Sequence, residues 1–354
     1  MKSSTPKITR ATQLDRMLQV ALRAPLSLSQ HLQPHALLPT GNSVPLSSEA
    51  YYAWISSALA AKGIRPCASQ LGHLIRQLNA EAMLTLREET INLRIAHPTQ
   101  GTYTLDLANA SSEVINISAD GWKVTTDFDT RFHRPDNVIF FQPPVKVRTK
   151  LHHALKEIFQ LDETQSEQLS TWLVDALLTR HIPPTLIITG KCRHEAAAKI
   201  RNFADPMMSP VHSIPSSRKA LGRLAITNRV MAFGMYKTIT STKIEQLNEL
   251  RTGMLVELKQ VTKNSDLLTE LIRRPIILAA EAAPQIHEGQ IEIEINHIAL
   301  VESSDILAAL LDAAVSQIRE LQEQEARQVH LERAAPDTQI SPLTTEGEPE
   351  GPAP

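Results

Sequence analysis

The chain has 354 residues, of which 42% are hydrophobic and 21% are charged, a composition typical of a folded protein with two or three domains. It contains no apolar run near the length of a transmembrane helix and no secretory start, so we expect a cytoplasmic protein without a membrane partner. Its only cysteines, Cys67 and Cys192, lie far apart, which excludes a disulfide scaffold and fits a reducing compartment.

The charge is unevenly distributed, although the formal net charge is only -2. Residues 180–274 contain 16 Lys and Arg against 7 Asp and Glu, a surplus of about +9, whereas residues 281–354 contain 3 Arg against 15 Asp and Glu, about −12. A basic middle and an acidic end indicate either an anionic partner for the middle or a contact between the two segments, within one chain or between subunits of a homo-oligomer. A solvated basic surface is the alternative reading of the middle segment.

Residues 1–45 are expected to form one helix and then a loop or short irregular sheet broken by prolines. Residues 46–144 predict an α+β domain of winged-helix character, because two short helices precede several alternating strands. The helices of these two regions are expected at residues 11–23, 51–62 and 69–82, and the strands at residues 91–95, 102–107, 113–118 and 122–125.

The helix at residues 69–82 would read DNA if the helix pair is a helix-turn-helix. Four polar side chains are expected on its outer face, namely Gln70, His73, Arg76 and Gln77. The alternative is that the two helices only pack together.

Residues 145–333 predict a mostly parallel sheet with helices between its strands, and residues 334–354 predict a disordered acidic tail. Strands are expected at residues 185–189, 230–233, 275–279 and 291–299, with a further candidate at 255–261. Helices are expected at residues 151–159, 166–179, 196–203, 241–251 and 305–328.

The segment from residue 185 to 206 reads as a buried strand, a glycine turn at Gly190 and a helix, which is the frame of a phosphate-binding loop. A working loop of this kind also needs further glycines, a Lys that reaches the terminal phosphates and a Ser or Thr hydroxyl that holds Mg²⁺. This sequence has only Gly190, and residues 193–195 (Arg-His-Glu) or 196–198 (Ala-Ala-Ala) stand where the Lys and the hydroxyl belong.

Two groups come nearest to a metal-binding pattern: the pair Cys192 and His194, and the pair His152 and His153. Structural zinc sites need four ligands arranged in pairs, which neither group supplies. We therefore expect no metal site.

Several motifs together resemble a family of P-loop ATPases carried by phages and mobile elements. The most specific is residues 117–124, ISADGWKV; the others are residues 131–135, 185–190, 205–206, 229–233 and 273–278. Members of this family pair an N-terminal region containing "ITADGW" with an ATPase domain of AAA+ or helicase-like type, often beside a primase. The resemblance covers roughly residues 12–300 and implies a parallel-sheet P-loop (AAA+-like) core with ATP and Mg²⁺ as cofactors.

The sequence departs from that family at each catalytic position. The Lys and Ser/Thr of the loop fall on Ala196 and Ala197 or on Arg193 and His194, depending on the direction of counting. Gly234 stands in place of the acidic metal ligand and Ala279 in place of the sensor Asn, and residues 285–290 carry no Arg that could reach a neighbouring subunit. Because phosphoryl transfer depends almost entirely on electrostatic stabilisation, we expect no ATP hydrolysis and no cofactor.

The sequence therefore favours a degenerate P-loop domain, a pseudo-ATPase that acts as a scaffold or DNA-binding accessory protein in phage or mobile-element DNA replication or mobilisation. Its partners would be DNA and an active ATPase or primase. The basic side chains expected to meet phosphates are Arg218, Lys219, Arg223, Arg229, Lys237 and Lys243.

Two alternatives remain open at this point. The first is a divergent active ATPase or helicase that uses Lys191, Arg193 and Glu195 in unfamiliar roles, with Lys191 or Arg193 holding a phosphate at the helix N-terminus. The second is a DNA-binding regulator that acts through the N-terminal helix pair.

Overall fold

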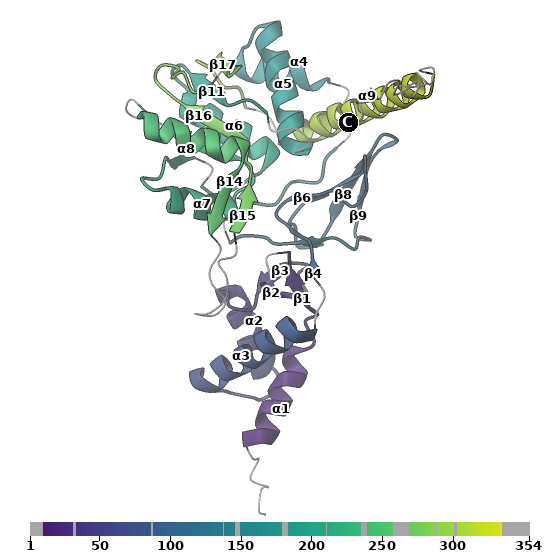
Figure 1. Cartoon of the computed structure of the whole chain (residues 1–354), viewed down its shortest axis with the longest axis vertical. Coiled ribbons are helices and arrows are strands. Elements are labelled where there is room, and N and C mark those ends of the chain that lie inside the picture. The colour runs from purple at the N-terminus through teal and green to yellow at the C-terminus, as the bar shows by residue number, and fades with distance from the viewer. Residues whose placement is uncertain are drawn as a thin grey trace, which may run out of the picture.

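The computed structural model describes residues 10–30, 33–85, 88–136, 138–145, 149–178, 183–209, 211–234, 239–257, 269–287, 289–300 and 303–334. It is a mixed α/β protein with several sheets, of which the largest is a parallel sheet of five strands. The N-terminal unit lies at one end of the molecule, at the bottom of Figure 1, and the parallel sheet lies at the other. Among the helices of these ranges, none combines the length and apolarity that crossing a membrane would require.

The N-terminal unit contains three helices and a four-stranded sheet with the order β3-β2-β1-β4. Its elements are α1 (Arg10–Ala21), β1 (Leu26–Ser29), β2 (Pro34–Leu37), β3 (Ser43–Pro45), α2 (Glu49–Ala60), α3 (Ala68–Thr85) and β4 (Glu88–Glu89). The helix predicted after Ser48 begins there, because the Ser48 hydroxyl accepts the N–H of Tyr51 at 3.2 Å and caps it.

One hydrophobic core holds this unit together. Met17 of α1, Tyr51 and Ile55 of α2 and Leu74 of α3 are all buried in it, together with Val44 of the sheet. Helix α1 and the sheet thus share their core with the helix pair that follows, because α1 and the sheet cannot bury their apolar faces alone.

The strands after the helix pair form a separate antiparallel meander with the order β6-β7-β8-β9. They are β6 (Ile95–Ala96), β7 (Tyr103–Asp106), β8 (Val114–Ser118) and β9 (Gly121–Thr125), and a short parallel pair, β5 (Ile91–Asn92) and β10 (Arg131–Phe132), flanks them. The buried Ile115 and Ile117 of β8 belong to the same core as the parallel sheet. A winged-helix domain at residues 46–144 is thus not confirmed.

The parallel sheet has the strand order β12-β13-β16-β11-β17. Its strands are β11 (Leu186–Thr189), β12 (His212–Ser213), β13 (Met231–Gly234), β16 (Ile276–Ala279) and β17 (Ile291–Glu294). The accompanying helices are α4 (Leu151–Phe159), α5 (Glu163–Leu178), α6 (Arg193–Ala204), α7 (Arg218–Thr227), α8 (Ser241–Thr252) and α9 (Ser303–Ala334). The strands predicted at residues 185–189, 230–233 and 275–279 are confirmed within one residue at each end.

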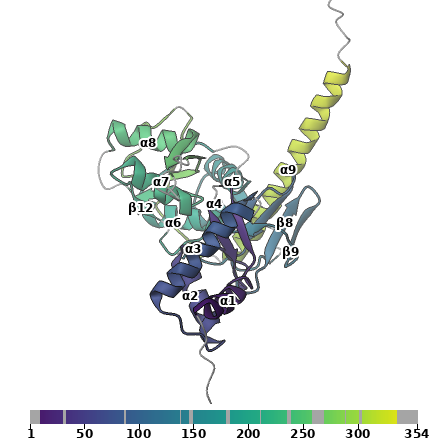
Figure 2. The same ribbon diagram turned by 60° about the horizontal axis from the view of Figure 1, so that its bottom comes forward.

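Side chains on the two faces of this sheet enter different cores, as expected for a sheet covered on both sides. Leu186 and Ile188 face the core shared with α5, α6 and α9, whereas Ile187 faces the core shared with α7 and α8. Of the candidate strand at residues 255–261, residues 255–257 lie outside the sheet, in an antiparallel pair of β14 (Met254–Glu257) and β15 (Thr269–Ile272), and residues 258–261 lie outside the described residues. Helix α9 projects from the body (Figure 2).

A buried carboxylate joins the N-terminal half of the chain to the sheet. Asp205, 2% exposed, lies at the end of α6 and pairs through Oδ1 with Arg94 Nε at 3.4 Å and through Oδ2 with Arg201 Nη2 at 3.8 Å. Its Oδ2 also accepts the backbone N–H of Arg229 at 3.1 Å and of Val230 at 3.3 Å. Arg94 in turn donates to the carbonyls of residues 106, 139 and 206, so one cluster ties three segments together.

We predict that Asp205→Asn lowers the free energy of unfolding by about 3–5 kcal/mol, because it leaves buried guanidinium groups without a counterion. Urea denaturation measures the effect. Asp127→Asn, at an exposed carboxylate, is the matched control and should change stability by less than about 0.5 kcal/mol. Equal effects of the two substitutions would contradict the role assigned to the cluster.

Candidate functional site

The candidate site is the turn at residues 190–192, where β11 ends and α6 begins. β11 is hydrogen-bonded on both sides, to β16 and to β17, and all of its residues are buried. Open α/β sheets bind their ligands at the carboxyl ends of the strands, where the direction of strand order reverses. Ile188, two residues before Gly190, pairs with Ala279, and Ala279 pairs with Gly234. The three positions expected at a phosphate site, Gly190, Ala279 and Gly234, therefore lie on neighbouring strands at that edge.

The backbone N–H groups of the turn are already bound within the chain. Lys191 N donates to the side-chain oxygen of Asn296 at 2.9 Å, and Cys192 N donates to the Ile295 carbonyl at 3.1 Å. Asn296 is oriented by Glu294, whose Oε1 accepts its Nδ2 at 2.9 Å. The amides that would surround a phosphate therefore point at the segment after β17.

Gly190 is required by this contact. Its φ is +94°, and a Cβ built on it would lie 2.5 Å from the Ile295 carbonyl oxygen and 2.9 Å from Asn296 Oδ1. A glycine is therefore needed at this position because the turn lies too close to the backbone of Ile295 for a side chain to fit. Nothing in the sequence singled out Asn296, because its role depends on the parallel pairing of β17 with β11.

Helix α6 begins at Arg193, three residues earlier than predicted, which leaves a turn of only residues 190–192. The Arg193 side chain folds back, and its Nη1 donates to the Gly190 carbonyl at 3.1 Å. Lys191 and Glu195 are exposed. The two basic side chains of the turn therefore do not converge on one point.

The ring of His194 lies against the end of β13. A Cβ on Gly234 would be only 2.9 Å from His194 Nδ1, so the imidazole fills the space beside the position where the acidic metal ligand would stand. Burial, and then the charge of Arg193, lower the pKa of His194 below its ordinary value. A mainly neutral ring at this place supplies neither the charge of a carboxylate nor that of a lysine.

We predict that Gly190→Ala destabilises the fold by about 1–3 kcal/mol more than Gly63→Ala does, because Gly190, unlike Gly63, combines a positive φ with a crowded Cβ position. Gly63 has a φ of +70° and nothing within 4 Å of its Cβ position, so it isolates the cost of the backbone conformation. Urea denaturation of both variants measures the difference. Equal losses would show that the contact with residues 295 and 296 does not constrain the turn.

We also predict that acid destabilises the protein partly through His194. Its folded-state pKa lies below its unfolded value, so the unfolded state takes up the proton first as the pH falls. The stability from neutral His194 is therefore complete above about pH 6.5 and is lost below it. Between about pH 7.5 and 5.5, His194→Gln should lose less unfolding free energy than the wild type. If His194→Gln lost as much unfolding free energy as the wild type over this pH range, the prediction would be wrong. His73→Gln, which changes an exposed histidine, is the control and should behave as the wild type does.

The side chains proposed to contact DNA do not form one surface. His73, Arg76 and Gln77 are exposed on α3 as predicted. Gln70 is half-buried, and its Oε1 accepts the N–H of Cys67 at 2.9 Å at the start of the helix.

The basic candidates of the C-terminal half are also dispersed. Lys219 and Arg223 are exposed on α7, Arg218 pairs with Glu249, and Lys243 is half-buried on α8. Arg229 is buried, with its Nη2 donating to the carbonyls of residues 176 and 177. Lys237 lies outside the described residues.

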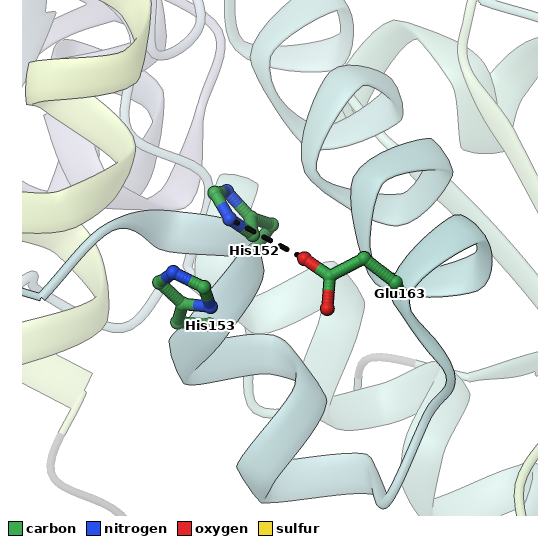
Figure 3. A group of neighbouring side chains, drawn as sticks. All are labelled: His152, His153 and Glu163. Carbon is green, nitrogen blue, oxygen red and sulfur yellow. Dashed lines mark ion pairs between the residues drawn. The ribbon is translucent and has the colours of Figure 1, made fainter.

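The pair His152 and His153 lies beside Glu163, with ligand atoms all within 4.8 Å of one another (Figure 3). His152 Nε2 lies 3.7 Å from Glu163 Oε1. The other carboxylate oxygen accepts Lys156 Nζ at 2.6 Å, so an ammonium group already neutralises this carboxylate. Cys192 Sγ lies 3.3 Å from the Asn296 carbonyl, to which it donates. Neither group thus presents a set of ligands prepared for a metal ion.

The chain matches no protein-family model and no curated protein sequence. Two solved structures, both described as A form apo structures of the NrS-1 C terminal region, align with 86% of this chain at 10% sequence identity. Their TM-scores are 0.45 and 0.41, and the alignments cover 68% and 67% of those chains. Because both TM-scores lie below 0.5, these similarities carry no argument about this chain.

Proposed function

We propose that the chain is a catalytically inactive ATPase-like protein, a pseudo-ATPase that serves as a scaffold or DNA-binding accessory in phage or mobile-element DNA replication or mobilisation. One observation carries the inactive part of this proposal. The turn that would bind phosphates donates the Lys191 and Cys192 amides to Asn296 and Ile295 instead. The biological process rests on the sequence resemblance described above.

The strand order supports an ATPase-like ancestry for the sheet. β11, the strand ahead of the turn, is inserted between β16 and β17, which are the last two strands of the sheet along the chain. A buried strand that has two parallel neighbours and leads into a glycine turn supports the P-loop core that the sequence resemblance implies.

The chemistry of phosphoryl transfer explains why this edge is poorly suited to ATP. A triphosphate with Mg²⁺ needs positive charge on its terminal phosphates and an acidic group that holds the metal shell. Here Gly234 and Ala279 supply neither function, and the ring of His194 occupies the adjoining space. The missing elements reinforce each other, because electrostatic stabilisation supplies most of the catalysis of this reaction.

The alternative of a divergent active enzyme has less support. Arg193 is held by the Gly190 carbonyl, and the exposed carboxylate of Glu195 lies in the first turn of α6, where it repels an anionic ligand. A regulator acting through the helix pair retains the exposed face of α3, but α2 and α3 both pack on α1 as parts of one unit.

We predict no saturable thermal stabilisation by MgATP. A site with a Kd of about 50 μM would gain about 2.7 kcal/mol at about 5 mM ligand, which raises the Tm by about 5–11 °C in a domain of this size. Differential scanning fluorimetry with wild-type protein and increasing MgATP measures this shift.

Arg193→Ala is the diagnostic variant for this measurement. A saturable shift that Arg193→Ala abolishes would overturn the proposal, since it would place the nucleotide at the turn. Lys150→Ala, which removes an exposed basic side chain at the start of α4, is the matched control.

A further inference from the structure

A cleft of 1190 Å³ lies between the N-terminal unit and the parallel-sheet region, on the side of the β14–β15 pair. One wall comes from β1 and β5 and carries Gln33 and Asn92. The other wall comes from the ends of α7, α8 and β15. This cleft is separate from the turn at residues 190–192, none of whose residues line it.

The cleft is basic. Four arginines line it, Arg229, Arg251, Arg273 and Arg274, and none of the described residues that line it is an Asp or a Glu. Three histidines, at positions 35, 97 and 133, also line it, and burial lowers the pKa of His97 and of His133, which favours their neutral form. A concave surface lined by one sign of charge concentrates its field on the ligand and attracts anions.

Two of these guanidinium groups, those of Arg229 and Arg251, have a nitrogen without an acceptor among the described residues. Arg229 is only 6% exposed, and its Nη1 has no acceptor among the described residues, although its Nη2 is held by the carbonyls of residues 176 and 177. Within the same part of the chain, Arg251 Nε also has no acceptor. Buried polar groups left in this state are unusual and favour a bound anion that completes them.

The electrostatics of Arg229 agree with this reading. Burial, and then the nearby charges of Arg274 and Arg94, lower the pKa of Arg229 to about 9 against the opposing effect of Asp205. A phosphate in the cleft would relieve the repulsion between these arginines. Arginine is also the side chain whose planar fork best matches a phosphate group.

We propose that this cleft binds single-stranded nucleic acid. The wall that carries the four arginines, the arginine wall, contacts the phosphates, and the opposite wall contacts the bases. The volume corresponds to a cube about 11 Å on a side, too small for a duplex, whose major groove alone is about 12 Å wide. It exceeds the usual range for a small-molecule pocket, about 300–1,000 Å³. Gln33, Asn92 and the histidine rings offer the amide and stacking contacts that unpaired bases accept.

This inference deepens the accessory role proposed above by naming its surface, and it rests on that part of the proposal. The two can fail separately. The measurement of nucleotide binding tests the turn at Gly190, whereas the measurement of oligonucleotide binding tests the cleft.

The test is fluorescence anisotropy of a labelled oligo(dT) of about 20 nucleotides, titrated with the full chain at several salt concentrations. Arg251→Gln with Arg273→Gln removes two charges from the arginine wall. We expect the double variant to bind at least about 10-fold more weakly than the wild type and to reduce the slope of log K against log salt by about 1.4. The matched control, Arg16→Gln with Lys150→Gln, removes two exposed charges outside the cleft and should bind as the wild type does.

A second variant keeps the test decisive if the arginine double variant does not fold. Gln33 is exposed on the opposite wall, and Gln33→Glu introduces a carboxylate there without removing an arginine. It should also weaken binding several-fold. Unchanged melting temperatures establish that both variants are folded.

Four results would overturn the inference. The first is no binding by the wild type, and the second is equal loss in the control variant. The third is tighter binding of a duplex of the same length, and the fourth is displacement of the oligonucleotide by polyglutamate at equal charge concentration, which would identify an acidic peptide as the ligand. A MgATP shift that survives Arg193→Ala but disappears in Arg251→Gln with Arg273→Gln would assign the nucleotide to the cleft and leave the inactive turn unaffected.

Discussion

The carboxylate of Asp205 is the interaction on which the arrangement of this protein depends. It pairs with Arg94, which lies just before the meander, and with Arg201 in its own helix, and it accepts the backbone N–H groups that lead into β13. Three of these groups come from segments that are distant in sequence. Because a buried charge must be paired and hydrogen-bonded, this one carboxylate fixes the meander, α6 and β13 relative to one another.

The same cluster explains why the cleft beside it is positively charged. Asp205 supplies one negative charge to Arg94 and Arg201, and it binds only the backbone N–H of Arg229 rather than its guanidinium. The Arg229 side chain is instead held by carbonyl oxygens at the end of α5, which are dipoles without net charge. Arg229, whose guanidinium is held by these carbonyls, is one of the four arginines that line the cleft.

The sequence predicted the strand, the glycine and the helix of the site, but not the side chains that contact them. β11, Gly190 and α6 could be predicted because a continuous apolar run, a glycine and a helical period are local signals. Asn296 and His194 could not, since Asn296 meets the turn only through the pairing of β17 with β11, and His194 meets Gly234 only across the sheet edge.

The N-terminal half shows the same limit. The positions of the strands within residues 102–125 could be predicted from the alternation of their residues. Their packing on α9 could not, because it includes a hydrogen bond from Trp122 Nε1 to Asp312 Oδ1 at 2.8 Å, between residues that are 190 positions apart. The burial of Arg229 could likewise not be predicted from the sequence, because an arginine in a basic stretch is ordinarily exposed.

The uneven charge of the chain allowed, as one explanation, a contact between its acidic end and its basic middle. If the acidic end neutralised the basic middle, the acidic side chains of α9 would be expected at the cleft. Helix α9 instead packs against α4, α5, β8 and β9. Its Asp312 accepts a hydrogen bond from Trp122, and its Glu325 accepts one from Gln100 at 3.2 Å, both on the meander. These acidic side chains of α9 therefore contact the meander, and among the described residues none of α9 lines the cleft.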